Sequence, residues 1–228
     1  MRAFDKKMLH KSMSWIRSDV RGLRALIWVA ARRKYPRRTE ECFGISDCGA
    51  GGCEERPLII SFGTEGSIYE ERLHELEAAS DRLGHEHALS LFASGDANFI
   101  RRLKPSFIKL KLLESRRTVV WLDCDSQLRE AFQFPIGNWD VGTMTHGQNW
   151  RRSLRSANVI AFRPSASAVR FLEVWEYLCM LDRGGGSDHF HFHQAFSVVG
   201  NSILEIDIKS SISGKIMRGK LGQEFFEI

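Results

Sequence analysis

From residue 57 onward, short apolar runs alternate with longer segments in which apolar residues recur every three or four positions. The short runs predict buried strands, and the longer segments predict amphipathic helices. We expect strands at 58–62, 87–92, 118–122, 156–162 and 203–208, and helices at 69–83, from 104 onward and at 165–181. This alternation indicates βαβ units, and therefore an α/β fold with a mostly parallel sheet flanked by helices.

The helix expected from Lys104 onward has Pro105 near its first turn, a position that suits proline. Its apolar face is expected to carry Phe107, Leu110 and Leu113. These residues should therefore pack against the sheet.

Residues 3–34 carry a different pattern, with apolar residues on one helical stripe and lysine or arginine over much of the remainder. Tyr35-Pro36 should end this pattern, because a proline disfavours helical backbone at the residue before it. A basic amphipathic helix suits an anionic membrane surface. It equally suits packing on the rest of the chain or on a partner. The predicted organisation is a helical extension at 1–41, a Gly/Cys linker at 42–56 and one domain at 57–228.

The charge of the 228-residue chain, formally +5, is unevenly distributed. Residues 1–47 hold 12 Lys/Arg and 5 Asp/Glu, a net charge of +7, whereas the remainder holds 21 and 23, a net charge of −2. The excess basic charge belongs to the extension, so it does not indicate a nucleic-acid-binding protein. The sequence contains no run of about 18 apolar residues, so it does not predict a membrane-spanning helix.

The five cysteines do not form a disulfide framework, because their number is odd and the chain is not short. Cys42, Cys48 and Cys53 lack a fourth ligand and the usual ligand spacing, which favours a linker with reduced thiols over a zinc site. Cys124 and Cys179 lie among apolar residues and are expected in the core. Together with the lack of a secretory signal pattern, this predicts a cytoplasmic protein, with possible peripheral contact at the inner face of the membrane.

The chemistry centres on the strand that ends in Asp123-Cys124-Asp125. Ligands bind beyond the carboxyl ends of strands in open α/β sheets, and carboxylates one residue apart point to the same side. A hard divalent cation such as Mg²⁺ or Mn²⁺, shared with phosphates, would satisfy both carboxylates. In isolation the motif is more typical of two solvated acids.

Further motifs follow the same order as in a known group of enzymes. A Lys104-Pro105-led helix precedes the Leu-Asp-x-Asp strand, and Asp140-Val141-Gly142 follows it. The segment 156–175 then combines a Ser-led strand with an amphipathic helix that contains Phe-Leu-x-x-Trp. This order resembles the GT-A sugar-nucleotide glycosyltransferases, particularly the nucleotide-diphospho-sugar transferase families, over about residues 57–208. The resemblance implies a Rossmann-type GT-A-like catalytic domain at 57–228.

The resemblance implies a metal-dependent transferase that moves a sugar from a UDP- or GDP-linked donor to a glycan, lipid-linked or protein acceptor, as in polysaccharide biosynthesis. Asp125 would bind the Mn²⁺ or Mg²⁺ ion, and Asp123 would bind the ribose or the metal through water. Thr64 follows the first strand, where these folds hold the nucleotide. Asp188 is the candidate general base of an inverting reaction, and Gln194 would face the donor sugar.

The chain departs from the family pattern in three places. Ala157 stands where the family usually has glycine, and the usual Asp-Gln pair reads His193-Gln194. The C-terminal segment also lacks the histidine that commonly completes the metal site. Water would then complete it, or Lys215, Arg218 or Lys220 would contact the diphosphate as fixed charges.

The alternating residues His189, His191 and His193 would share one face of a strand, as a transition-metal site requires. The glycines at 184–186 and the intervening phenylalanines instead favour a half-buried loop.

Two other functions compete with the glycosyltransferase interpretation. A nucleotidyltransferase usually has a basic phosphate-binding loop after its first strand, and the segment 63–66 contains no basic residue. A non-catalytic, membrane-associated scaffold with a GT-A-like fold is the stronger alternative, because of the departures named above.

Overall fold

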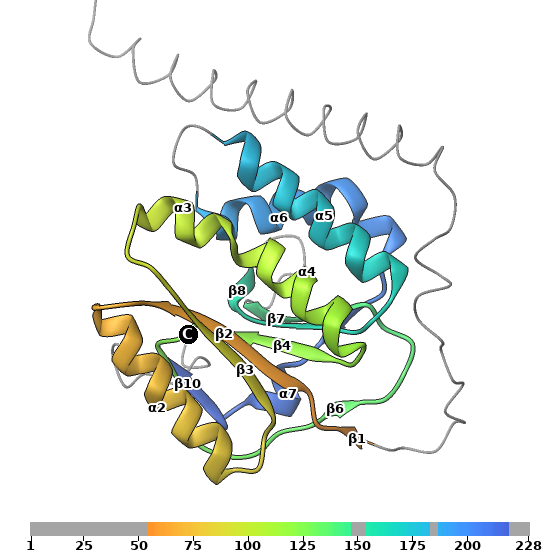
Figure 1. Cartoon of the computed structure of the whole chain (residues 1–228). Helices are drawn as coiled ribbons and strands as arrows, with labels where there is room; N and C mark the ends of the chain where they lie inside the picture. Colours follow the sequence, from red (N-terminus) through yellow and green to blue (C-terminus); the bar gives the residue numbers. More distant parts are fainter. Residues whose placement is uncertain (1–53, 147–153, 183–186, 219–228) are drawn as a thin grey trace, which may run out of the picture.

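The computed structural model describes residues 54–146, 154–182 and 187–218. The strands are β1 (Glu54–Glu55), β2 (Leu58–Thr64), β3 (His87–Phe92), β4 (Val119–Leu122), β5 (Ser126–Leu128), β6 (Phe134–Pro135), β7 (Val141–His146), β8 (Leu154–Phe162), β9 (Glu205–Asp207) and β10 (Ile216–Arg218). The helices are α2 (Ile68–Arg82), α3 (Ala97–Arg102), α4 (Lys104–Ser115), α5 (Ala166–Leu181), α6 (Asp188–Val199), the short 3-10 helix η1 (Gly200–Ser202) and α7 (Lys209–Ile212). Figure 1 shows that helices cover both faces of a central sheet.

The central sheet has six strands in the order β3-β2-β4-β8-β7-β9. β2 pairs in parallel with β3 and β4, and β7 pairs in parallel with β9. β8 runs antiparallel to both of its neighbours, β4 and β7. Two small antiparallel pairs, β1 with β6 and β5 with β10, flank this sheet. The expected α/β fold with a mostly parallel sheet is therefore confirmed.

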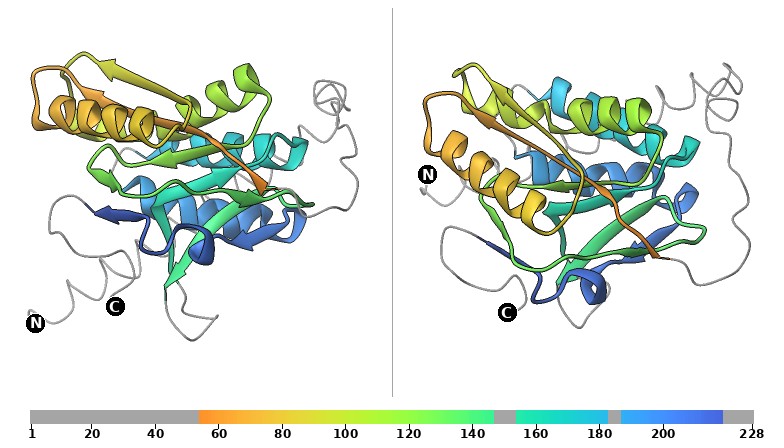
Figure 2. Two further views of the ribbon diagram at one scale, coloured as in Figure 1. Left: turned by 90° about the horizontal axis from the view of Figure 1, so that it is seen from below. Right: turned by 60° about the horizontal axis from the view of Figure 1, so that its bottom comes forward.

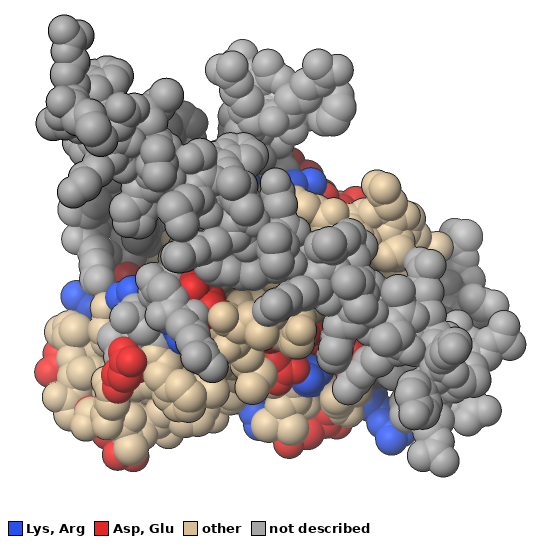
Figure 3. All heavy atoms as spheres, turned by 90° about the horizontal axis from the view of Figure 1, so that it is seen from above, with Lys and Arg blue, Asp and Glu red and all other residues tan. Residues whose placement is uncertain are grey.

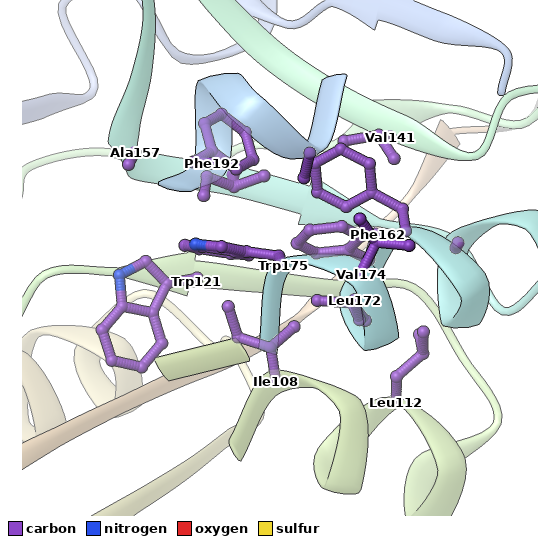
Figure 4. Close-up of a cluster of buried hydrophobic side chains, with 14 of the residues drawn as sticks. Ile108, Leu112, Trp121, Val141, Ala157, Phe162, Leu172, Val174, Trp175 and Phe192 are labelled. Atoms are coloured by element: carbon purple, nitrogen blue, oxygen red, sulfur yellow. The ribbon is translucent and has the colours of Figure 1, made fainter. Parts of the chain in front are cut away.

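The sheet separates two hydrophobic cores, because successive side chains of a strand point to opposite faces. Val119 and Trp121 of β4 belong to the core that α4, α5 and α6 cover. Val120 and Leu122 belong to the core on the other face, under α2, α7 and β10. A strand that is covered on both faces is apolar at every position, which explains the uninterrupted apolar run at 119–122. Figure 4 shows the first core, and Figure 2 gives further views of the layers.

Serine hydroxyls mark the starts of helices α2 and α5. Ser67 precedes α2 and accepts a hydrogen bond from the Tyr69 amide, and Ser165 precedes α5 and accepts one from the Ala168 amide. Such side chains satisfy amides that have no partner within the helix. The hydrogen bonds of Ser67 and Ser165 therefore fix the residues at which α2 and α5 begin.

The histidine-rich segment forms helix α6, so the expectation of a half-buried loop is wrong. Ser187 caps the helix by accepting a hydrogen bond from the Phe190 amide at 3.2 Å. Phe192 and Phe196, four positions apart, are buried on one side of the helix and contact each other. The aromatic residues therefore follow the helical period, and they pack into the core beside α5.

The expected apolar face of α4 is also partly wrong. Phe107 is buried as expected, but Leu110 and Leu113 are 49% and 41% exposed. Ile108 and Leu112 are instead completely buried. The helix is therefore rotated relative to the face that the sequence pattern favoured.

The predicted extension at 1–41 lies outside the described residues, as do Cys42, Cys48 and Cys53 of the linker. Glu54–Glu55, at the end of the predicted linker, form β1 and pair with β6. Among the helices of the described segments, none combines the length and apolar character needed to cross a bilayer. On the face in Figure 3, the visible acidic and basic side chains are interspersed.

Candidate functional site

A cavity of about 450 Å³ opens where β2 and β4 end. These strands are parallel neighbours, so their carboxyl ends meet at the same edge of the sheet. Thr64 lines the cavity at the end of β2, and Asp123 and Asp125 line it after β4. Asp188 lines it from the start of α6. Four of the residues singled out from the sequence thus lie around one cavity, at the edge where open α/β sheets bind ligands.

Asp123 is held at the cavity by its main chain and by its side chain. Its amide donates to the Asn158 carbonyl at 2.9 Å. Its Oδ1 atom accepts hydrogen bonds from Lys104 Nζ at 3.0 Å and Trp121 Nε1 at 2.8 Å. Burial raises the pKa of this carboxyl, while Lys104 and the Trp121 hydrogen bond act in the opposite direction. Both hydrogen bonds end on Oδ1, so they do not occupy Oδ2.

Lys104, the first residue of α4, places a buried ammonium group between two carboxylates. Nζ lies 3.0 Å from Asp123 Oδ1 and 2.5 Å from Asp188 Oδ2, and the side chain is 7% exposed. It also donates to the Ala157 carbonyl at 3.3 Å and lies 5.0 Å from the centre of the Trp121 ring. Burial alone would lower the Lys104 pKa, but the two carboxylates outweigh it and raise that pKa above the ordinary value.

Contacts of both its side chain and its main chain hold Asp188 in place. Its carboxylate accepts from Lys104, and its main-chain carbonyl accepts from Trp175 Nε1 at 3.1 Å. Burial alone would raise the pKa of Asp188, yet the contact with Lys104 and the His189 amide hold it below the ordinary value. The negative side chain also lies in the first turn of α6, where the helix dipole favours it. Asp188 is therefore an anion with a fixed position.

Asp125 and Thr64 also line the cavity. Asp125 is half-buried. The Thr64 hydroxyl lies 2.7 Å from that of Ser67, which caps α2. A Cβ atom on Gly63 would meet the Tyr69 carbonyl oxygen at 2.6 Å, so only glycine fits at the point where β2 passes α2. This close approach brings the end of β2 and the start of α2 together at the cavity.

Gln194 and Lys215 do not line the cavity. Gln194 Oε1 lies 3.2 Å from Nδ1 of His191, a completely buried residue whose Nε2 lies 2.9 Å from Asp182 Oδ2. The Lys215 carbonyl accepts the Arg129 amide, which ties the start of β10 to the end of β5.

Arg218 lies opposite Ser126 in the pairing of β10 with β5. The main chain of Arg218 is thus beside the residue that follows Asp125. Its side chain lies outside what the structure describes.

The sequence reasoning did not assign three of the cavity-lining residues to this site. Arg101 comes from the six-residue helix α3, which is too short to produce a periodic pattern. His189 lines the cavity from α6, and its Nδ1 accepts the Ala157 amide at 3.4 Å. Cys124, expected in the core, is half-buried and lines the cavity, whereas Cys179 is completely buried as expected.

The carboxylates of Asp123 and Asp125 fit a divalent cation that is shared with a ligand. Both line the cavity, and Asp123 keeps Oδ2 for such a contact. Within the described segments, however, no group of three or more His, Cys, Asp or Glu residues is arranged to hold a metal ion. The fit is therefore to an ion whose remaining ligands come from phosphate oxygens and water, as Mg²⁺ commonly has.

Comparison with known proteins adds evidence on the fold. No protein-family model and no curated protein sequence matches the chain. Among solved structures, the chain is similar to a glycosyltransferase involved in the glycosylation of the major capsid of PBCV-1, with 12% identity, a TM-score of 0.50, and coverage of 68% of this chain and 88% of that one.

Two further solved structures match at lower TM-scores. The galactosyltransferase LgtC, in complex with donor and acceptor sugar analogs, has 13% identity and a TM-score of 0.40, with 60% of this chain and 70% of that chain covered. Mouse xyloside xylosyltransferase 1 has 10% identity and a TM-score of 0.41, with 72% and 98% covered. The likeness to the PBCV-1 enzyme shows that this chain has a GT-A-like glycosyltransferase fold.

Proposed function

We propose that the chain is a glycosyltransferase that uses a sugar linked to UDP or GDP as its donor. One observation carries the proposal: Asp123, Asp125 and Asp188 line a single cavity at the carboxyl ends of β2 and β4. The fold around that cavity is one that a glycosyltransferase also has. A fold alone does not determine function, so the arrangement of the three carboxylates supports the assignment.

The cavity offers different chemistry along its length. Thr64 and Tyr69 lie at the junction of β2 and α2, and we assign the nucleoside to this end. Asp123 and Asp125 would hold a Mn²⁺ or Mg²⁺ ion beside the diphosphate. When bound, that ion neutralises charge that accumulates on the leaving diphosphate.

In the proposed reaction, an acceptor oxygen bonds to the anomeric carbon while the bond from that carbon to the diphosphate oxygen breaks. The acceptor must lose its proton. In an inverting reaction Asp188 would receive it, because it lines the cavity and its contact with Lys104 favours the ionised form that a base needs. The same contact lowers the proton affinity of Asp188. Asp188 would therefore first accept a hydrogen bond from the acceptor hydroxyl and take its proton only as the new bond to the anomeric carbon forms.

The other predicted contacts stay proposals. Gln194 would have to leave His191 in order to face the donor sugar. Lys215 and Arg218 would approach the diphosphate from the β10 side. We also propose that the acceptor is a glycan, lipid-linked or protein hydroxyl, and that residues 3–34 bring the enzyme to the inner face of a membrane.

Calorimetric titration with UDP and GDP, each with and without Mn²⁺, tests the proposal. The full chain should bind at least one of them, and Mn²⁺ should increase the affinity. The Asp125→Asn variant should lose the increase caused by Mn²⁺. Asp81→Asn is the matched control, because Asp81 is an exposed acid that pairs with His87 away from the cavity.

Two results would contradict the proposal. If neither nucleotide binds to the unaltered chain, the non-catalytic scaffold becomes the better interpretation. If Asp125→Asn keeps the full Mn²⁺ effect, Asp125 is not a metal ligand.

A further inference from the structure

The charged side chains around the cavity are unequally available to a ligand. Three carboxylates line it, from Asp123, Asp125 and Asp188, together with the cations of Lys104 and Arg101. A nucleoside diphosphate brings more negative charge to this acidic cavity. Which of these two cations, among the residues that the structure describes, can meet the diphosphate therefore matters for binding.

The protein itself uses all the hydrogen-bonding capacity of Lys104. A lysine ammonium has three N–H donors and no acceptor. Nζ has three protein acceptors within reach, which are Asp123 Oδ1 at 3.0 Å, Asp188 Oδ2 at 2.5 Å and the Ala157 carbonyl at 3.3 Å. The side chain is also almost fully buried. Lys104 would have to give up one of these contacts in order to bind a phosphate.

Arg101 is in the opposite situation. It lies in the last turn of α3, is exposed and lines the cavity. Ile100, the preceding residue, is 8% exposed and belongs to the core under α4 and α5, so the backbone beside Arg101 is anchored. No described residue forms a hydrogen bond or an ion pair with the Arg101 side chain. Its guanidinium group keeps five N–H donors in the planar arrangement that matches phosphate oxygens.

We propose that Arg101 binds the diphosphate of the ligand, and that Lys104 acts only by positioning Asp123 and Asp188. The inference rests on the proposed function, since it takes the ligand to be a nucleoside diphosphate. It assigns the role of a fixed positive charge to Arg101, which lines the cavity. This role adds to the one proposed for Lys215 or Arg218. A guanidinium beside phosphate oxygens forms charge-assisted hydrogen bonds, often in pairs.

The test compares Arg101→Gln with the unaltered full-length chain by calorimetric titration, in the presence of Mg²⁺. The probes are UDP, GDP, the nucleosides uridine and guanosine, and inorganic pyrophosphate. Arg101→Gln should weaken the binding of pyrophosphate and of the preferred nucleotide about tenfold, the lower end of the effect of a hydrogen bond to a charged group. Binding of the nucleosides should be unchanged.

The matched control is Arg82→Gln, because Arg82 is an exposed arginine in the last turn of α2 that does not line the cavity. This variant should bind every probe as the unaltered chain does. Arg101→Lys should recover part of the lost affinity, since it keeps the charge but not the paired donors. Thermal unfolding of Arg101→Gln should match that of the unaltered chain, because the side chain is exposed.

Several outcomes separate this inference from the proposed function. Equal affinity of Arg101→Gln and the unaltered chain for the nucleotide and for pyrophosphate would overturn the role of Arg101. An equal loss of nucleoside affinity would also overturn it, because the effect would then lie outside the diphosphate. If the unaltered chain binds neither UDP nor GDP, the proposed function fails, while pyrophosphate still tests Arg101. If pyrophosphate does not bind either, the inference fails as well.

Discussion

The ion pair between Lys104 and Asp188 allows a quantitative prediction of stability. Asp188→Asn keeps the shape of the side chain and removes its charge. Removing one partner of a buried ion pair typically costs about 3–5 kcal/mol. The loss should be smaller here, about 2 kcal/mol, because Lys104 keeps its contact with Asp123 and asparagine still accepts a neutral hydrogen bond.

The pH dependence of this loss has a definite sign. Asp188 has a lowered pKa in the folded protein, so its stabilisation is complete above the unfolded value of about 3.9 and is lost as the pH falls through the folded value. Urea unfolding should therefore show the full difference between Asp188→Asn and the unaltered chain near neutral pH. The difference should narrow below about pH 4.

The matched control is Asp81→Asn, which removes an exposed acid from its contact with His87. Its effect should stay below about 1 kcal/mol, as for other surface pairs. The reasoning is refuted if Asp188→Asn is no less stable at neutral pH, or if its deficit grows as the pH falls.

Three other predictions concern different parts of the chain. In Gly142→Ala, the new Cβ would lie 2.6 Å from Ile208 Cγ2, so urea unfolding should show a loss of about 1–3 kcal/mol. Gly137→Ala, where the nearest atom would be 3.9 Å away, should change the stability by less than about 0.5 kcal/mol; equal effects would contradict the packing argument. Lys104 has a raised folded pKa, so the stability difference between the unaltered chain and Lys104→Met should persist up to about pH 10 and decline only above it; a decline near neutral pH would contradict this. Removal of residues 1–50 should reduce sedimentation with anionic vesicles and leave donor hydrolysis intact, whereas loss of folding would show that the extension belongs to the core.

The elements that were predictable from the sequence are those with a strong local signal. The strand at 119–122 is apolar at every position because both faces of the sheet are covered, and the helix at 166–181 combines a serine cap with regular apolar spacing. Helix α6 was missed because His and Phe alternate with a period of two at its start. β5 and β10 were missed because each has three residues and finds its partner far along the chain.

The candidate site was predictable to a similar extent. A strand that ends in two acids identifies Asp123 and Asp125 from the sequence alone. The partners of Lys104 could not be predicted in this way. Asp123, Ala157 and Asp188 are separated from it by 19 positions or more along the chain. Only the packing of α4, β4, β8 and α6 brings these residues together, so no local pattern could reveal the buried ammonium.

The shared ammonium also constrains how this protein can change over evolutionary time. Loss of Lys104 alone would leave Asp123 and Asp188 as neighbouring, half-buried anions without their shared cation. Loss of Asp188 alone would leave the buried Lys104 with one carboxylate. Exchange of both residues for uncharged ones avoids each of these intermediate states. We therefore expect positions 104 and 188 to covary among relatives of this chain, whereas position 101, which has no partner among the described residues, should vary independently of both.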